Sequence, residues 1–418
     1  MTNIRETLVR LVSTDSVTGQ ETRIADELES RLRPLSTGSQ SLIRIGDSLI
    51  LGPVTPGASG RPLVVLAGHL DTVPLGDAWP PRVDGEILHG RGVVDMKAGV
   101  ATMIHLAEEL DPDAGFCERA FVFYTGEEGP AEGNSLGPVL ESLAWLRKAE
   151  LAILLEPTSG GLELGCKGTL HCRVVFTGRA CHSARPWTGL HPFEAALPWL
   201  EAVRRIPERP VEIAGVVFRE AVVVTKIHAG EARNVSPGSL EVNLNVRYAP
   251  DRTPEEAERW ARSLCPTPRP ASPEGAAVSP EDAVGVSVEI VDHAGPGLVD
   301  LSAPLFRYLL DATGLPREAK QGWTDVARFG AFGVPAVNWG AGDPLLCHRA
   351  DERLDLREVE ALRRGVANEL GRLFARLADG EVEDRSSFGG KSSPGLGNGN
   401  ERVGLLFGYA PPDRTAPR

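Results

Sequence analysis

The sequence has few cysteines, no surplus of positive charge and no long hydrophobic run. Six cysteines occur in 418 residues, and no two of them form a Cys-x-x-Cys pair. This spacing argues against a disulfide framework and against a structural zinc site made of thiolates. We expect most of the six to be small buried hydrophobic side chains. They are Cys117, Cys166, Cys172, Cys181, Cys265 and Cys347.

The balance of charge and hydropathy narrows the function classes further. With 57 acidic residues against 44 Lys and Arg residues, the formal net charge is -13. This argues against nucleic-acid binding, because phosphate contacts need a basic face. No apolar run approaches the roughly 20 residues that cross a bilayer, and the first residues are charged where a signal peptide is apolar. We therefore expect a cytoplasmic protein without a membrane partner, and its length predicts two domains.

The segment 63–74, LVVLAGHLDTVP, organises the rest of the chain. Residues 63–67 are an unbroken apolar run, the pattern of a strand buried on both faces. His69 and Asp71 follow at the end of this strand, where ligands collect in open α/β sheets. They are typical of a metal ligand and of the carboxylate that orients it. Taken alone, they would equally fit a hydrogen-bonded core histidine and a turn cap.

Two more apolar segments end in acidic residues. Residues 120–124 are followed by TGEEG, which contains Glu127 and Glu128, and residues 151–155 are followed by Glu156. Adjacent carboxylates repel each other unless a cation or a shared proton relieves the repulsion. Asp95 stands before a stretch of small and apolar residues that predicts a buried helix. This alternation of strands and helices predicts an α/β domain with a mainly parallel sheet flanked by helices.

From about residue 165 the pattern changes to half-exposed strands. We predict strands at 168–176, 221–227, 240–248 and 286–291, with helices at 192–206 and 254–264. This β-α-β-β-α-β order predicts a ferredoxin-like α+β domain inserted into the first one. The predicted domains are a discontinuous catalytic domain at 1–165 and 296–378 and an inserted domain at 166–295. We expect the remaining segment, 379–418, to be a disordered tail, because its composition lacks any amphipathic period.

The acidic and imidazole side chains at the predicted strand ends form one constellation. Two imidazoles and three carboxylates suit two divalent ions with one carboxylate between them, and such a pair of ions favours hydrolysis. The spare Glu127 would take the proton of the attacking water, while Asp71 would orient His69. The five predicted ligands are His69, Asp95, Glu128, Glu156 and His348.

Five ordered motifs carry a resemblance to a known family. GHLDTVP (68–74), GRGVVDMKAG (90–99), YTGEEG (124–129), LLEPT (154–158) and the late His348 resemble the dinuclear-zinc amidohydrolases. That family includes succinyl-diaminopimelate desuccinylase, acetylornithine deacetylase, aminoacylase and related exopeptidases. The resemblance covers about residues 1–378.

The resemblance implies roles for individual residues in the first domain. It implies that Asp95 bridges two Zn²⁺ ions, for which Co²⁺ can substitute, with His69 and Glu156 completing one site and Glu128 and His348 the other. It also implies that Glu127 is the general base and that the Asp95–Met96 peptide bond is cis.

For the inserted domain, the resemblance implies a lid that forms a homodimer. His182, in ACHSARPW, resembles a lid histidine that enters the partner's active site and stabilises the oxyanion. Four further residues resemble substrate contacts: Lys167, Asn234, Arg247 and Thr324. Lys167 departs from the family, since the desuccinylases usually have Arg at this position.

The resulting prediction is hydrolysis of N-succinyl-LL-2,6-diaminopimelate to succinate and LL-2,6-diaminopimelate. One alternative is the same chemistry on another small anionic N-acyl amino acid, such as N-acetylornithine, or on a small peptide. The other is a metal-binding scaffold without catalysis, against which Asp71 and Glu127 speak, because a structural metal site needs no unliganded base.

Overall fold

The computed structural model describes residues 3–115, 117–271 and 282–378, so the predicted tail at 379–418 lies outside the described residues. The chain forms two compact units. Of the described residues, the first comprises those of 3–164, 299–318 and 328–378, and the second those of 165–298 and 319–327.

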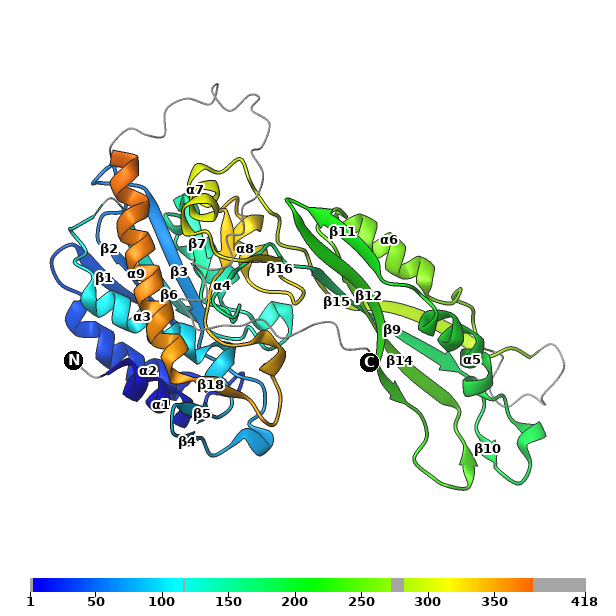
Figure 1. Ribbon diagram of the computed structural model, residues 1–418. Coiled ribbons are helices and arrows are strands. Elements are labelled where there is room, and N and C mark those ends of the chain that lie inside the picture. The colour runs from blue at the N-terminus through cyan, green and yellow to red at the C-terminus, as the bar shows by residue number, and fades with distance from the viewer. Residues whose placement is uncertain (1–2, 116, 272–281, 379–418) are drawn as a thin grey trace. The chain divides into compact units, whose positions relative to one another are not determined.

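The first unit contains an eight-stranded sheet whose centre is parallel (Figure 1). The strands β6, β3, β7 and β17 lie side by side and run in one direction, as the apolar runs predicted. Every residue of β3 is buried, because helices cover both faces of a parallel sheet. In spatial order the strands are β1 (Gln40–Ile45), β2 (Ser48–Pro53), β6 (Glu118–Tyr124), β3 (Leu63–His69), β7 (Leu151–Leu154), β17 (Ala336–Asn338), β8 (Leu162–Leu164) and β16 (Arg317–Ala319).

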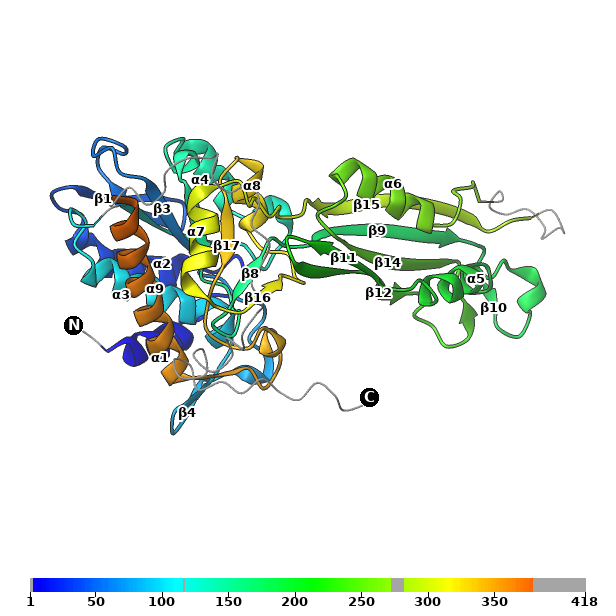
Figure 2. The ribbon, with the colours of Figure 1, turned by 45° about the horizontal axis from the view of Figure 1, so that its top comes forward.

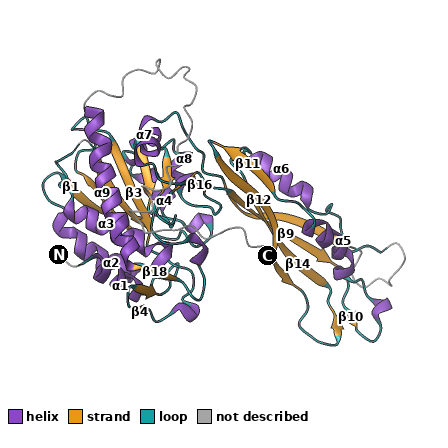
Figure 3. Ribbon diagram, viewed as in Figure 1, coloured by secondary structure: helices purple, strands orange, loops and turns teal. Residues whose placement is uncertain are grey.

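Helices cover this sheet, as Figure 3 shows by secondary structure. The first helix, α1, begins at a side-chain cap, where Asn3 accepts a hydrogen bond from the Arg5 backbone N–H at 3.0 Å. It packs on α3, which in turn packs on α9. The helices of this unit are α1 (Ile4–Ser13), α2 (Thr22–Leu32), α3 (Ala98–Glu109), α4 (Leu136–Ser142), α7 (Pro304–Thr313), α8 (Val326–Ala331) and α9 (Leu356–Ala378). A small antiparallel sheet joins β4 (Arg82–Asp84), β5 (Ile87–His89) and β18 (Arg353–Asp355).

The second unit is built on a five-stranded antiparallel sheet (Figure 2). Its order is β11 (Arg209–Ile213), β12 (Val216–His228), β14 (Ser239–Tyr248), β9 (Gly168–Thr177) and β15 (Gly285–Ala294). Apart from β11, the strands of this sheet and the two helices α5 (Pro192–Arg204) and α6 (Pro254–Leu264) occur along the chain as β9, α5, β12, β14, α6 and β15. This is the predicted β-α-β-β-α-β order. The edge strand β11 was not predicted. A short ladder of β10 (Cys181–His182) with β13 (Val235–Ser236) was not predicted either.

Alternation along β14 separates a core face from a polar face. Leu240, Val242, Leu244 and Val246 belong to a buried cluster on which residues of α5 and α6 also pack. Period-2 alternation places residues 241, 243, 245 and 247 on the opposite face of the strand, and these are Glu, Asn, Asn and Arg. The sheet of the second unit therefore has one apolar face and one polar face.

The unit boundaries differ from the predicted ones mainly at one segment, and also at residues 165 and 296–298, which group with the second unit. Residues 319–327 group with the second unit, although the sequence placed the whole of 296–378 in the first domain. Within this segment the Trp323 indole N–H donates to the Gly295 carbonyl at 2.9 Å, which ties the segment to the unit that it joins. No helix of the described residues is long and apolar enough to span a bilayer.

Candidate metal centre

The parallel strands bring the predicted ligands of the first unit to one edge of the sheet. His69 is the last residue of β3, Glu127 and Glu128 lie in the turn after β6, and Glu156 follows β7. Because β6, β3 and β7 are neighbours that run in the same direction, their carboxyl ends meet. Gly126 makes the turn after β6 possible. Its φ is +79°, and a Cβ there would lie 2.3 Å from the Gly133 carbonyl oxygen.

Asp95 lies between the two predicted histidine ligands. Its Oδ1 is 3.2 Å from His69 Nε2, and its Oδ2 is 3.3 Å from His348 Nε2. The two carboxylate oxygens therefore face different imidazoles. The Asp95–Met96 peptide bond is cis, as the family resemblance implied.

Ligand atoms gather in three groups, each within a span of 4.8 Å. One group contains His69, Asp95 and Glu156, and a second contains Asp95, Glu128 and His348, so that Asp95 belongs to both. Glu127 joins a third group with His69 and Glu128. The five predicted ligands and Glu127 therefore lie at this one place, with His69 fully buried and the His348 side chain 51% exposed.

Charge is concentrated here. The carboxylates of Asp95 and Glu128 face one ring nitrogen of His348 and raise the pKa of that histidine to about 10. Burial and the neighbouring charge of Asp95 raise the pKa of Glu128. Although burial disfavours the ionised form of Asp95, hydrogen bonds from His348 and His69 hold its pKa well below the usual range. The pattern is that of a site with strongly negative potential.

Asp71 does more than the sequence predicted. Its carboxylate lies 3.5 Å from His69 Nδ1, while its backbone carbonyl lies closer to the same nitrogen, at 3.0 Å. The carboxylate also accepts hydrogen bonds from the backbone N–H groups of Glu127 and Glu128, at 3.1 and 3.0 Å, and from the Thr18 hydroxyl at 2.9 Å. Asp71 thus holds the acidic turn as well as the histidine.

A second supporting carboxylate was missed. Glu352 is buried and accepts hydrogen bonds from Arg91 at 2.8 Å and from the backbone N–H of Val94 at 3.0 Å. It fixes the loop that delivers Asp95. The only signals in the sequence were its position four residues after His348 and the arginine in GRGVVD, and neither spacing indicates that two such distant segments meet.

The residues present fit two divalent cations. Carboxylate and imidazole groups are the ligands that Zn²⁺ and similar ions take, and two ligand groups sharing one carboxylate match two neighbouring ions. The raised pKa of His348 supports the same conclusion, because the carboxylates that attract a proton to this ring would equally attract a metal ion.

The predicted residues of the second unit divide between two ends of its sheet. Lys167 and Arg247 lie at the end where Tyr248 pairs with Gly168. Burial and the charge of Arg247 lower the pKa of Lys167 to about 8, and its ammonium group donates to the Arg219 carbonyl at 2.6 Å. Two cations at one strand end could hold an anionic group.

His182 and Asn234 lie at the other end. His182 belongs to the short ladder of β10 with β13, and Asn234 directly precedes β13. The Ser183 backbone N–H donates to the Asn234 carbonyl at 3.0 Å, and the ladder lies next to the start of β14 (Figure 1). A strand of ten residues, the length of β14, spans roughly 30 Å. Within one chain, therefore, these two residues cannot contact the same small molecule as Lys167 and Arg247. Thr324 is buried in the same unit, where its carbonyl accepts a hydrogen bond from the Cys166 thiol at 3.4 Å.

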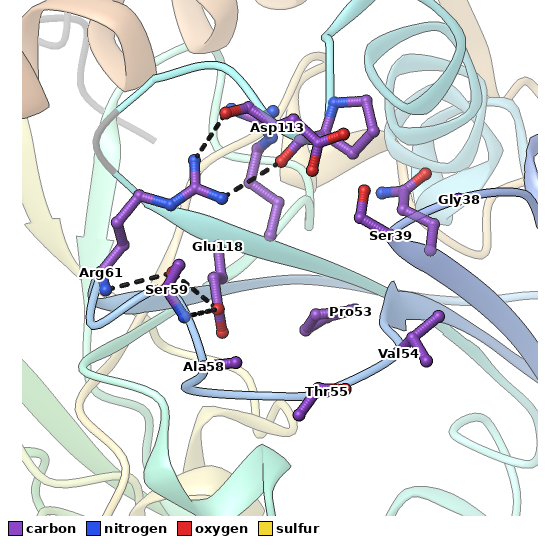
Figure 4. Close-up of a pocket in the computed structure, with 13 residues that line it drawn as sticks. Gly38, Ser39, Pro53, Val54, Thr55, Ala58, Ser59, Arg61, Asp113 and Glu118 are labelled. Carbon is purple, nitrogen blue, oxygen red and sulfur yellow. Dashed lines mark hydrogen bonds between the residues drawn. The ribbon is translucent and has the colours of Figure 1, made fainter.

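A separate cavity of about 280 Å³ lies in the first unit (Figure 4). Its lining includes Arg61, Asp113 and Glu118 but none of the predicted ligands. The Glu118 carboxylate accepts hydrogen bonds from the Gly57 backbone N–H and the Ser59 hydroxyl, both at 2.7 Å. These contacts fasten one loop to the amino end of β6, so the cavity belongs to the supporting structure and not to the cluster.

A parallel α/β sheet with clustered carboxylates and imidazoles at its carboxyl edge defines the class of metal-dependent hydrolases. A family model, described as peptidase family M20/M25/M40, matches residues 65–368. The chain belongs to this family, and it is a metal-dependent amidohydrolase.

Relatives and solved structures of the same family are similar over most of their length. A Mycobacterium tuberculosis protein provisionally named succinyl-diaminopimelate desuccinylase is 38% identical over 85% of this chain and 94% of its own. The succinyl-diaminopimelate desuccinylase of Corynebacterium glutamicum is 37% identical over 84% of this chain and 91% of its own. The structure of a dinuclear metal-binding peptidase of the M20 family from Bacillus subtilis matches with a TM-score of 0.59 and 13% identity, covering 89% of this chain and 98% of that one. This last likeness confirms the fold.

Proposed function

We propose that the protein hydrolyses the amide bond of N-succinyl-LL-2,6-diaminopimelate, using two divalent ions that are most simply Zn²⁺. The observation that carries the proposal is Asp95, whose two oxygens face His69 and His348 at 3.2 and 3.3 Å. Such a carboxylate suits a bridge between two ions, with His69 and Glu156 on one side and Glu128 and His348 on the other. The substrate assignment rests on the names of the relatives at 37–38% identity.

The chemistry divides between the ions and the side chains. Bound ions would polarise the scissile carbonyl and lower the pKa of the attacking water. Glu127 accepts the proton of that water and passes it to the leaving nitrogen. The Asp71 carboxylate accepts a hydrogen bond from the Glu127 backbone N–H. This contact holds Glu127 in place without a bond between Glu127 and a metal ion. His182 stabilises the oxyanion.

The substrate contacts belong to the second unit. Lys167 and Arg247 hold an anionic end of the substrate, while Asn234 and Thr324 make further contacts. Because His182 and Asn234 lie at the far end of the same sheet, we propose that a second copy of the chain supplies them in a homodimer. The prediction of a cytoplasmic location stays a prediction.

Turnover measurements with two substrates test the proposal. Purified protein is given N-succinyl-LL-2,6-diaminopimelate or N-acetylornithine, with added Zn²⁺ and after chelation. We expect zinc-dependent release of succinate and at least tenfold lower kcat/KM for acetylornithine, because its acetyl group lacks the free carboxylate through which a succinyl group can bind. A preference for acetylornithine would overturn the substrate assignment, and a lack of turnover of both would favour the scaffold alternative.

A further inference from the structure

A row of hydrogen-bonded polar side chains crosses the polar face of the second unit's sheet and ends on Arg247. Strands β9 and β14 pair antiparallel with Asn245 opposite His171 and Arg247 opposite Thr169. All four side chains therefore lie on the face opposite the hydrophobic core. Asn245 is only 7% exposed, which is unusual for an asparagine on a sheet face and requires its amide to be hydrogen-bonded.

The contacts run in sequence from the arginine to the next strand. Arg247 Nε donates to Asn245 Oδ1 at 3.0 Å, and Asn245 Nδ2 donates to His171 Nε2 at 2.9 Å. The other ring nitrogen, His171 Nδ1, lies 3.0 Å from Nδ2 of the Asn243 side-chain amide. That amide in turn lies 2.6 Å from the Thr225 hydroxyl on β12.

The donors and acceptors of these side chains fix which atom donates in each hydrogen bond of the row. A guanidinium cannot accept a hydrogen bond, so Asn245 must turn its oxygen to Arg247 and its NH₂ group to His171. His171 Nε2 must then accept, which places the imidazole proton on Nδ1. The structure has Asn243 Nδ2 facing Nδ1, so this tautomer requires the Asn243 amide to be flipped, with its oxygen accepting from Nδ1–H and from the Thr225 hydroxyl. With the Asn243 amide so turned, a neutral His171 satisfies its contacts with both asparagines, whereas a doubly protonated ring would turn an N–H toward the NH₂ group of Asn245.

We propose that Asn245 and His171 are positioning residues that fix the Arg247 guanidinium for the anionic end of the substrate, with His171 as the neutral Nδ1–H tautomer. The proposal rests on the proposed function, because it takes Arg247 as a substrate contact. Protonation of His171 would turn an N–H toward the NH₂ group of Asn245. The amide would then have to rotate, and the arginine would lose its acceptor.

The charges around His171 favour the neutral form. Burial is the main cause that lowers its pKa, and the charge of Arg247 on β14 acts in the same direction, while Asp292, its pairing partner on β15, opposes them. Further off are Arg173 on its own strand and Lys226, which pairs with Asn243 from β12. The hydrogen-bonded row of Arg247, Asn245 and His171, called the relay below, is therefore intact at neutral pH. Its hydrogen bond between Asn245 and His171 is lost as the pH falls through the pKa of His171.

Kinetics of three variants test the relay. Asn245→Ala should raise KM for N-succinyl-LL-2,6-diaminopimelate at least tenfold at pH 8 with kcat changed less than threefold, and Arg247→Ala should do the same. His171→Gln offers a carbonyl oxygen to Asn245 but cannot titrate. It should keep KM within threefold of the wild type at pH 8 and lack the rise in KM that the wild type shows toward pH 5.5. His228→Gln, an exposed histidine on β12, is the matched control and should keep the wild-type pH profile.

A substrate-free measurement separates this inference from the proposed function. In ¹⁵N-histidine-labelled full-length protein, NMR should show His171 neutral with its proton on Nδ1 at pH 8, identified by the loss of its signals in His171→Gln. The Nε2–H tautomer would overturn the relay even if turnover is normal. So would an Asn245→Ala variant with wild-type KM, or a ratio of wild-type to His171→Gln KM that is constant from pH 5.5 to 8. If the wild type turns over neither acyl amino acid, the proposed function fails, and the tautomer still decides the relay.

Discussion

At the scale of single residues, the adjacent Glu127 and Glu128 show how two identical side chains can have different surroundings. Glu128 faces His348 at 3.0 Å, in the group that also contains Asp95. Glu127 shares a group with His69 and Glu128 but not with Asp95. The backbone N–H groups of both residues are held by one carboxylate, that of Asp71. This turn therefore gives the two glutamates different surroundings, which fits the proposed roles of Glu127 as a base and Glu128 as a ligand.

This difference predicts the behaviour of Glu127→Ala. The variant should lose roughly 10²–10⁴-fold in kcat, the usual contribution of a general base, and keep two metal ions per chain. Turnover assays together with metal analysis by inductively coupled plasma measure both. Glu132→Ala, an exposed glutamate of the following loop, serves as the control. Loss of metal from Glu127→Ala would reassign Glu127 as a ligand.

At the scale of elements, the metal cluster depends on how closely α3 approaches the end of β7. A Cβ on Gly99 would lie 2.2 Å from the Leu155 carbonyl oxygen, so the helix contacts the strand end through backbone atoms. The residue after Leu155 is Glu156, a predicted ligand. The position of Glu156 therefore depends on the close packing of α3 against the end of β7.

Gly99→Ala should be destabilising for this reason. We expect a loss of about 3 kcal/mol in the free energy of unfolding, since the clash is with backbone that cannot rotate away, and a reduced metal content. Gly330→Ala, in α8, is the matched helical control, because nothing lies within 4 Å of its Cβ position. It should gain about 0.5 kcal/mol. Urea unfolding of both variants gives the comparison, and equal stabilities would contradict the packing argument.

In the second unit, a buried carboxylate ties three strands together. Glu220 on β12 accepts hydrogen bonds from Arg209 on β11, at 2.7 Å, and from Arg252 and the Ala249 backbone N–H after β14, at 2.9 and 3.2 Å. Burial by itself would raise the pKa of Glu220. The hydrogen bonds outweigh it and lower the pKa to about 2.

Glu220 should therefore contribute to stability in a pH-dependent way. A carboxyl group whose pKa is lower in the folded state stabilises above its unfolded pKa of about 4.3, and the contribution is lost as the pH falls toward 2. Glu220→Gln should cost about 2 kcal/mol at pH 7, with the difference from the wild type shrinking between pH 4.5 and 2.5. Thermal unfolding across this range measures it, and Glu212→Gln, exposed on β11, should show no such trend. A difference that does not depend on pH would contradict the pKa argument.

At the scale of the whole molecule, the acidic cluster predicts that folding and metal binding are coupled. The cluster brings the carboxylates of Asp95, Glu128 and Glu156 together, and like charges oppose that arrangement unless cations are bound. Ions that bind only the folded state stabilise it by mass action.

Chelation should therefore lower the melting temperature. We expect a decrease of roughly 5–10 °C on removing the ions, if the metal-loaded sample holds free Zn²⁺ at about a hundred times its Kd. Adding Zn²⁺ should restore the melting temperature, and adding Mg²⁺ should not. Differential scanning fluorimetry after dialysis against a chelator makes the measurement. An unchanged melting temperature in the presence and absence of zinc would argue against a bound dimetal centre.

The proposed homodimer makes a separate prediction. If His182 acts in the partner's active site, a mixture of Glu127→Ala and His182→Ala chains, exchanged under mild denaturation, contains heterodimers with one intact site. About a quarter of the wild-type activity should return, because half of the dimers are mixed and each has one competent site. Each variant exchanged with itself is the control, and no recovery would place His182 with its own chain or outside the site.

The sequence by itself determined most of the elements and most of the residues that gather in the acidic and imidazole cluster. Apolar runs at 63–67, 120–124 and 151–155 specify buried parallel strands, and parallel neighbours bring their carboxyl ends together. This local rule is sufficient to gather His69, Glu128 and Glu156 before any coordinates are known. The alternating pattern from residue 168 likewise specified a half-exposed antiparallel sheet.

Only the tertiary structure decided the contacts between distant segments. The Glu352 carboxylate reaches Arg91 and the Val94 backbone, and the segment 319–327 joins the second unit, because loops take their positions from packing and not from any periodicity of their own. The pairing of His171 with Asn245 depends on strand register, and a one-residue shift of β14 against β9 would have turned Asn245 toward the core and away from His171. Periodicity fixes which face a residue occupies, whereas its partner across the sheet is set by the folded register.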